Sequence, residues 1–287
     1  MKKQLIAAAT AAGLTLMATT GQAVPIPPGS YYTDVIGGGI GDVAVMTGGG
    51  SSPGIGDPTG RNDDGFRGPI LLGFNLDYFG STYSSFYANN NGNISFGSGI
   101  SAYTPDPLNT TSEAPSIAPY WADVDTRGAG SGVMHVRTMT DQIIVTWDGV
   151  GYYSSHDDKL AYFQLVLRSS NYLIPPDEGQ IGFFFKTVDW ETGDASGGSG
   201  GFGGTEATVG FGDGLAAVNT GEISLAGSQQ PGISNVVENN HYWFLLGEGG
   251  TPEQPPVEAV PAPATLALMG IAALGMGAAR RRRSPSA

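Results

Sequence analysis

The sequence predicts an all-β fold, an antiparallel β-sandwich or a barrel-like domain, with an N-terminal signal peptide and one hydrophobic helix at the C-terminus. Three observations predict the β domain. Apolar and polar residues alternate with a period of two in several segments. Turn-forming residues separate these segments, and no internal segment keeps a helical period with caps at its ends. Many short strands divided by turns are typical of sandwiches and barrels.

The composition excludes several other classes of protein. Charged residues make up only 14% of the 287 residues, which argues against coiled coils and charge-driven disorder. The 26 Asp and Glu outnumber the 13 Lys and Arg, and six of these basic residues lie at the two ends of the chain. The acidic body repels phosphate groups, so nucleic-acid binding is excluded. Because the chain has no Cys, a sizeable core must supply its stability.

Residues 1–23 have the three parts of a secretory signal peptide. Lys2 and Lys3 precede an apolar run over residues 5–18, and Gly21-Gln22-Ala23 offers small residues for cleavage. The chain is therefore expected to leave the cytoplasm through the Sec machinery and to be cut after Ala23. An uncleaved N-terminal anchor is the alternative.

The remainder divides into four further segments. Residues 24–68 are rich in Gly and are expected to form an extended segment ahead of the domain. Residues 69–246 form the predicted β domain, and the Gly- and Ser-rich stretch 196–204 within it is expected to be flexible. Residues 247–259 are rich in Pro and Glu and predict a stiff spacer. Strands are expected at residues 70–79, 143–148, 161–168, 181–190, 207–211 and 242–246.

The last segment, residues 260–283, combines a Pro-containing motif, an apolar stretch and a basic cluster. Its motif and cluster are Val260, Pro261, Ala262, Pro263, Arg280, Arg281, Arg282 and Arg283. A helix over residues 264–279 spans about 24 Å, short of the roughly 30 Å hydrocarbon core, so it predicts a transient contact with the membrane. The arginines are expected to hold this end on the cytoplasmic side.

This segment resembles the PEP-CTERM sorting signal of bacteria that make extracellular polysaccharide, although Ala262 stands where that motif has Glu. The resemblance implies processing by a membrane protease of the exosortase type. It also implies delivery to the cell envelope or the outside, with transient or permanent anchoring at the C-terminus. An ordinary membrane anchor is the alternative.

Several blocks within the body resemble the nidogen-like extracellular domain. They begin near residue 62 and comprise residues 62–65, 72–80, 85–96 and 117–125, followed by Trp147 and the stretch up to Trp190. The resemblance implies a β-rich extracellular module with a role in cell–matrix adhesion and no catalytic activity. Trp121 and Trp147 are expected to pack in its core.

Asp123 and Asp125 are candidate metal ligands. On a strand, residues i and i+2 point to the same face, so two carboxylates are expected to converge there. Calcium is the natural partner, with Asp63-Asp64 or Asp157-Asp158 as further ligands. A solvated acidic edge is the alternative, because no twelve-residue calcium-binding loop occurs. Apart from this possible Ca²⁺, no cofactor is expected.

The turn over residues 151–158 is the candidate recognition loop, with Tyr152, Tyr153 and His156 as its aromatic and polar groups. The expected partner is a matrix polysaccharide or another exported protein. Two alternatives stay open: a calcium-dependent, lectin-like carbohydrate-binding module, and a hydrolase that uses paired carboxylates. Sequences typical of zinc proteases, serine hydrolases and phosphate-binding loops are absent.

Overall fold

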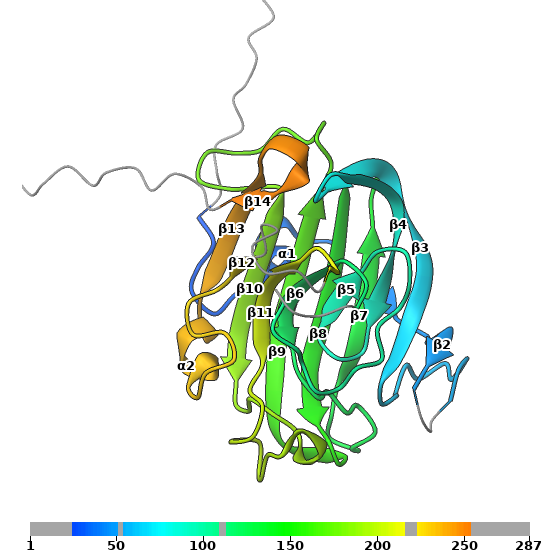
Figure 1. The fold of residues 1–287 in the computed structure, drawn as a ribbon, viewed down its shortest axis with the longest axis vertical. Coiled ribbons are helices and arrows are strands. Elements are labelled where there is room, and N and C mark those ends of the chain that lie inside the picture. The colour runs from blue at the N-terminus through cyan, green and yellow to red at the C-terminus, as the bar shows by residue number, and fades with distance from the viewer. Residues whose placement is uncertain (1–24, 51–53, 109–112, 216–222, 254–287) are drawn as a thin grey trace, which may run out of the picture. The chain divides into compact units, whose positions relative to one another are not determined.

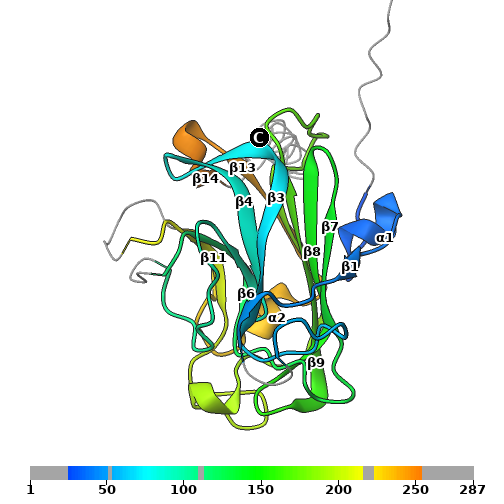
Figure 2. The ribbon, with the colours of Figure 1, turned by 90° about the vertical axis from the view of Figure 1, so that its right-hand side faces the viewer.

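Two antiparallel sheets of seven strands each pack face to face (Figures 1 and 2). The computed structural model describes residues 25–50, 54–108, 113–215 and 223–253. The predicted all-β fold is confirmed and is a sandwich. The predicted signal peptide and the predicted C-terminal helix lie outside the described residues. None of the helices within those residues is long and apolar enough to cross a membrane.

One sheet, called sheet A here, has the strand order β1-β7-β8-β9-β10-β13-β14. Its central strands β8, β9 and β10 are the long ones, and neighbours in the chain pair directly as hairpins. The bounds are β1 (Asp42–Val43), β7 (Val133–Thr138), β8 (Gln142–Tyr152), β9 (His156–Arg168), β10 (Ile181–Val188), β13 (His241–Leu246) and β14 (Pro252–Glu253).

The other sheet, sheet B, has the order β12-β11-β6-β5-β4-β3-β2. Its bounds are β12 (Ile223–Ser224), β11 (Thr208–Gly212), β6 (Ser116–Trp121), β5 (Asn93–Ser95), β4 (Ser81–Asn89), β3 (Gly65–Tyr78) and β2 (Gly48–Gly49). Two five-residue α-helices, α1 (Tyr32–Ile36) and α2 (Ile233–Val237), and two 3₁₀ turns, η1 (Asp194–Ser196) and η2 (Glu248–Gly250), complete the described elements.

The core lies between the sheets and is built from the predicted alternation. In β3, Leu72, Leu76 and Tyr78 are buried, whereas Leu71, directly before Leu72, is 75% exposed. In sheet A, the rings of Trp147 and Phe163 stack with their centroids 4.9 Å apart. Aromatic groups of this size provide the buried apolar area that a fold without disulfides needs.

The segment 24–68 differs from the extended loop that its glycines predict. It supplies α1, β1 and β2 and the first residues of β3, so it adds a strand to each sheet. Tyr32 on α1 joins a second apolar cluster on the outer face of sheet A, together with Ile144, Val166, Phe184 and Trp243. Sheet A carries apolar side chains on both faces, so its outer face must be shielded from water. The contact with Tyr32 shields part of that face and holds the segment against it.

Two shorter segments also differ from expectation. The predicted spacer begins inside the fold, since η2 and β14 lie within residues 247–253 and β14 pairs with β13. The Gly- and Ser-rich stretch 196–204 forms a hydrogen-bonded loop in which Gly201 O accepts from the backbone N–H groups of Glu191 and Thr192. Backbone hydrogen bonds hold both segments in place. Their amino-acid composition alone predicts a spacer and a flexible loop.

The turn between β4 and β5 is a tight hairpin of the kind that Asn and Gly residues favour. Asn90, Asn91 and Gly92 connect the strands, and Gly92 has a φ of 83°. The turn also docks on β6, because a Cβ at Gly92 would overlap the backbone carbonyl oxygen of Tyr120. Only glycine satisfies both the left-handed backbone and the close approach.

We expect Gly92→Ala to destabilise the protein much more than Gly80→Ala. Both glycines have left-handed backbones, with φ values of 83° and 75°, but a Cβ at Gly80 meets no atom within 4 Å. The left-handed conformation alone costs about 1–2 kcal/mol for alanine. The overlap with Tyr120 adds about 2 kcal/mol at position 92. Urea unfolding of both variants measures the difference, and equal losses of stability would show that the hairpin does not dock on β6.

Candidate functional site at one end of the sandwich

Three segments that are distant in the sequence meet at one end of the two sheets. They are residues 62–64 before β3, the turn 90–92, and residues 122–127 after β6. Asn91 Nδ2 donates to Asp64 Oδ1 over 2.8 Å, and Asn90 Nδ2 donates to the backbone oxygen of Val124 over 2.5 Å. Asp63 and Asp125 form an isolated antiparallel bridge. These side-chain and backbone contacts fix the positions of the acidic residues in this region.

Asp123 and Asp125 do not share one face of a strand, so this part of the sequence-based prediction is wrong. Strand β6 ends at Trp121, and the chain then turns from sheet B toward sheet A, where Val124 bridges to Tyr152. The period of two no longer holds in this irregular segment. The two carboxylates consequently have different neighbours.

Both oxygens of the Asp125 carboxylate accept hydrogen bonds from nearby residues. Its Oδ1 accepts from the backbone N–H and Nε of Arg127 over 2.9 and 2.8 Å, and its Oδ2 accepts from Arg127 and from the backbone N–H of Ser155. The same guanidinium lies 2.9 Å from Asp63 Oδ2. These carboxylates raise the pKa of Arg127 further above its ordinary value. Asp125 therefore acts as a structural anchor for the turn.

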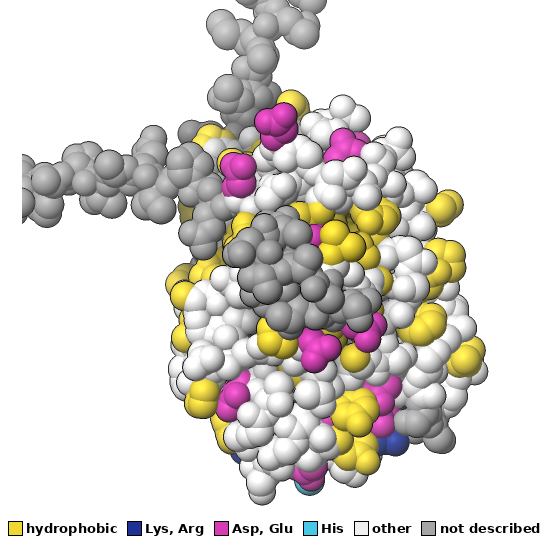
Figure 3. Space-filling model, in the orientation of Figure 1, with side chains coloured by type: hydrophobic (Ala, Val, Ile, Leu, Met, Phe, Trp, Pro, Cys, Tyr) yellow, Lys and Arg dark blue, Asp and Glu magenta, His cyan; other side chains and the backbone are white. Residues whose placement is uncertain are grey.

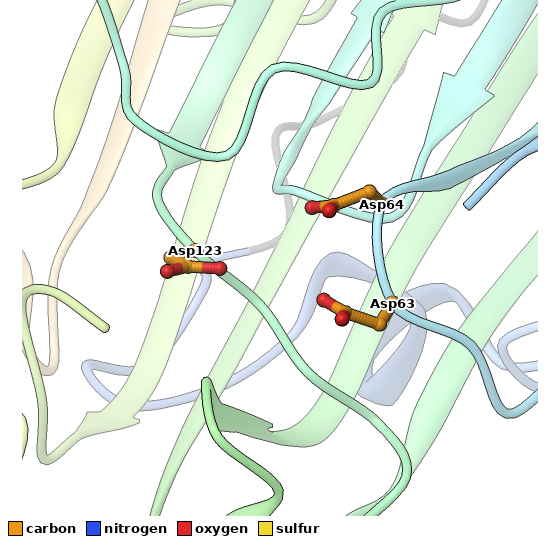
Figure 4. Close-up of side chains that lie close together, drawn as sticks. All are labelled: Asp63, Asp64 and Asp123. Carbon is orange, nitrogen blue, oxygen red and sulfur yellow. The ribbon is translucent and has the colours of Figure 1, made fainter. Parts of the chain in front are cut away.

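Asp123 meets Asp63 and Asp64 instead, as Figure 4 shows. One carboxylate oxygen from each residue lies within 4.8 Å of the others. Asp123 is 1% exposed and Asp63 is 3% exposed, whereas Asp64 is half-buried. Neither carboxylate oxygen of Asp123 has a hydrogen-bond partner among the described residues. The structure thus brings together Asp123 and the predicted Asp63-Asp64 pair, which we call the carboxylate trio.

Burial and repulsion both oppose the negative charge of Asp123. Desolvation, followed by the nearby charges of Asp64, Asp63 and Asp125, raises the pKa of Asp123 to about 8. Desolvation also raises the pKa of Asp64, against the hydrogen bond that Asn91 donates to it. The carboxylate trio is therefore a place where positive charge is strongly favoured.

Asp157 and Asp158, the other predicted pair, do not join the trio. Asp157 Oδ2 accepts from the backbone N–H of Gly130 over 2.6 Å. Asp158 accepts from the hydroxyl of Tyr152 over 2.9 Å and from Lys159 Nζ over 2.8 Å. Both carboxylates already have local donors.

The predicted recognition loop lies beside the trio, with one correction. Tyr152 is 1% exposed, and its ring packs on Trp190 and stacks on His156. It belongs to the core because it is the last residue of β8 and points inward. Tyr153 is partly exposed, and the His156 side chain is 39% exposed with Nε2 located 2.9 Å from Asp194 Oδ2. Only these two of the three residues offer accessible side chains.

Sequence reasoning missed three contributors to the site. Arg127 neutralises part of the acidic charge, Asn91 contacts Asp64, and Gly193 approaches Asp123 so closely that a Cβ there would lie 2.5 Å from Asp123 Oδ2. Arg127 could have been found from its position two residues after Asp125. No local signal points to Gly193, which comes from a third loop.

The chemistry available to the trio is that of oxygen ligands. Carboxylates of Asp are typical ligands of hard cations such as Ca²⁺, and no His or Cys belongs to the trio. On the face in Figure 3, Asp and Glu side chains are visible in several places and Lys and Arg side chains in few.

Comparisons with known proteins identify the family of the chain. A family model described as NIDO related matches residues 47–244, more than half of the chain, and a PEP-CTERM protein-sorting motif matches residues 259–283. The alpha-tectorins of Mus musculus and Homo sapiens are each 32% identical over 213 residues, and that of Gallus gallus is 29% identical over 214 residues.

The matched region covers 64% of this chain but only 9% of the mouse and human alpha-tectorins and 10% of the chicken protein. No solved structure matches the chain significantly. The match to the family model covers most of the sandwich, from β2 into β13, and all three segments that form the candidate site. The chain belongs to the NIDO-related family and is an exported extracellular or envelope protein that carries an exosortase-type sorting motif.

Proposed function

We propose that the protein is a non-enzymatic adhesion module that links the cell surface to matrix polysaccharide or to another exported protein. The observation that carries the proposal is the combination of one NIDO-related sandwich over residues 47–244 with a sorting motif over residues 259–283. The first supplies an extracellular recognition domain, and the second directs it to the cell exterior.

The recognition surface of this proposal is the loop end next to the carboxylate trio. Tyr153 and His156 are partly exposed there, and the Arg127 guanidinium lies 5.8 Å from the centroid of the Tyr153 ring. The two strands that flank this loop, β8 and β9, are the central strands of sheet A. Side chains on a rigid scaffold lose little conformational entropy on binding, which favours this end over more weakly held loops.

A calcium-dependent, lectin-like activity is the second candidate, and the carboxylate trio is the observation that favours it. In that case a cation near Tyr153 would contact sugar hydroxyls or hold the loop that does. Binding to the polysaccharide would then be lost in chelator, whereas binding through protein side chains alone would persist.

The sorting segment gives the first test. We expect the mature protein to lack Arg280–Arg283, and we expect replacement of all four arginines by Ala to leave the C-terminus intact. Without their charge this end is no longer held on the cytoplasmic side, so the segment is not presented to the protease. Mass spectrometry of the termini, separately on cells and culture medium, measures this. Replacement by four Lys keeps the charge and should keep processing; cleavage of the Ala variant at the normal position would contradict the mechanism.

The loop gives the second test. We expect Tyr153→Ala and His156→Ala together to weaken binding to the polysaccharide of the producing cells by about tenfold or more, because aromatic contacts at a loop end carry a large share of binding energy. Leu173→Ala is the control, since Leu173 is 92% exposed in the loop after the other end of β9. Equal binding by all variants in a pull-down assay would remove this loop from the recognition surface.

A further inference from the structure

We propose that Asp63, Asp64 and Asp123 bind one Ca²⁺ ion, which ties the segment after β6 to the segment before β3. The proposal concerns a site within the fold and holds whether or not the protein is adhesive. It also replaces the Asp123 and Asp125 pair that the sequence indicates with a different set of ligands.

The first argument is distance. Ca²⁺ binds oxygen ligands at about 2.3–2.6 Å, so two ligands on opposite sides of one ion lie about 4.6–5.2 Å apart. One oxygen from each residue of the trio lies within 4.8 Å of the others. Figure 4 shows the three side chains approaching one another from two separate chain segments. A single ion can therefore contact all three without a rearrangement of the backbone.

The second argument is the state of the Asp123 carboxylate. The side chain is 1% exposed, and within the described part of the chain neither of its oxygens accepts a hydrogen bond. A buried carboxylate is stable only when it is paired, hydrogen-bonded or bound to a metal. Arg127 is paired with Asp63 and Asp125, so one guanidinium faces four carboxylates in this region. A divalent cation would supply the missing positive charge.

The third argument comes from residues outside the trio. Asn90 and Asn91 are 0% and 1% exposed, and the Oδ1 atom of each lacks a hydrogen-bond partner among the residues described. The Asn91 amide is held against the trio by its bond to Asp64, and the Asn90 amide is held against Val124, next to Asp123. Amide oxygens are common calcium ligands, so the segment that borders the trio holds two buried acceptors that lack a partner among the described residues.

The nature of the ligands selects the metal. Zinc prefers His and Cys, which the trio lacks. Magnesium demands short distances of about 2.0–2.1 Å and near-ideal octahedral geometry, whereas Ca²⁺ accepts irregular oxygen shells. Extracellular calcium modules commonly have a Kd of about 10⁻⁴–10⁻³ M.

The bound ion would also act on the neighbouring loop. The backbone N–H of Tyr153 donates to Asp123 O over 3.1 Å, and the N–H of Asp125 donates to Gly151 O over 3.2 Å. Fixing Asp123 and the segment around it therefore restrains the β8 end of the β8 to β9 turn. Cation binding and the conformation of this loop are coupled through these two backbone bonds.

The first test is thermal unfolding of the purified full-length chain after removal of bound metal. We expect about 10 mM Ca²⁺ to raise the Tm by about 3–10 °C over chelator, given an affinity in the extracellular range and a domain of this size. Isothermal titration should give one ion per chain. An unchanged Tm in calcium, or an equal increase with the same concentration of Mg²⁺, would overturn the assignment.

The second test is Asp123→Asn, which keeps the shape of the side chain and removes its charge. We expect this variant to lose the calcium-dependent increase in Tm, while its Tm in chelator equals or exceeds that of the wild type because the buried repulsion is gone. Asp177→Asn is the control, since Asp177 is exposed beyond the other end of β9 and has a left-handed φ of 64° that Asn tolerates.

The control should keep the full calcium response. If Asp123→Asn does not fold, Asp64→Asn provides the same test at a half-buried position. Retention of the full calcium response by a folded trio variant would show that the ion binds elsewhere. Absence of polysaccharide binding by the wild-type protein, together with an intact calcium response, would count against the adhesive role and leave the cation site standing.

Discussion

The connection between the two sheets at residues 122–126 is the constraint on which the rest of this end of the molecule depends. Its backbone pairs with both halves of the sandwich: Ala122 N donates to Asn91 O, and Thr126 N donates to Asn62 O on the side of sheet B. Val124 bridges to Tyr152 on the side of sheet A. A segment held on both sides cannot move away from the charges that its own side chains bring together. The carboxylate trio is therefore a consequence of topology as well as of sequence.

Aromatic packing stabilises the sandwich next to this polar end, in a chain that has no cysteine for disulfides. Trp147 stacks on Phe163, while Tyr120 packs against Phe163 and, edge to face, against Trp190. Trp147 Nε1 donates to Asn90 O and Trp190 Nε1 donates to Val150 O, so both buried indoles satisfy their polar atoms. The core thus extends to the base of the candidate site and restrains the hairpin turn that carries Asn90 and Asn91.

Sequence reasoning located strands such as β3, β8 and β9 because their signal is local, whereas the ranges expected from alternation did not include β6 or β7. The alternation in β3 and the turn at Asn90-Asn91-Gly92 each depend on neighbouring residues only. The role of residues 24–68 was not predictable in this way, since the contact of Tyr32 with Phe184 joins residues far apart in the sequence. One local signal for this packing is present in β8. Ile143, Ile144 and Val145 are all apolar, which predicts that both faces of the strand are buried and that another segment covers the outer face.

The sequence identified the acidic residues of the site but not how they pair, because pairing depends on contacts between distant segments. The acidic residues were recognisable, but their pairing depends on where β6 ends, and the loss of the two-residue period after Trp121 sends Asp123 and Asp125 to different neighbours. Tyr152 and Tyr153 illustrate the effect of one position: the first ends a strand with its ring in the core, and the second lies in the turn. Periodicity assigns faces only while the strand continues.

A buried, unpartnered carboxylate is costly for any protein to keep, and its persistence here needs a physical reason. An Asn at position 123 would have the same shape without the repulsion from Asp63 and Asp64. The charge of Asp123 stabilises the fold only when a cation is present, because the attraction of the three carboxylates for the ion then outweighs their repulsion of one another. Under the proposed assignment the fold would be weakest where calcium is scarce and would gain stability where calcium is plentiful. For a protein with a sorting motif for export, this would make the final stability of its loop end depend on arrival outside the cell.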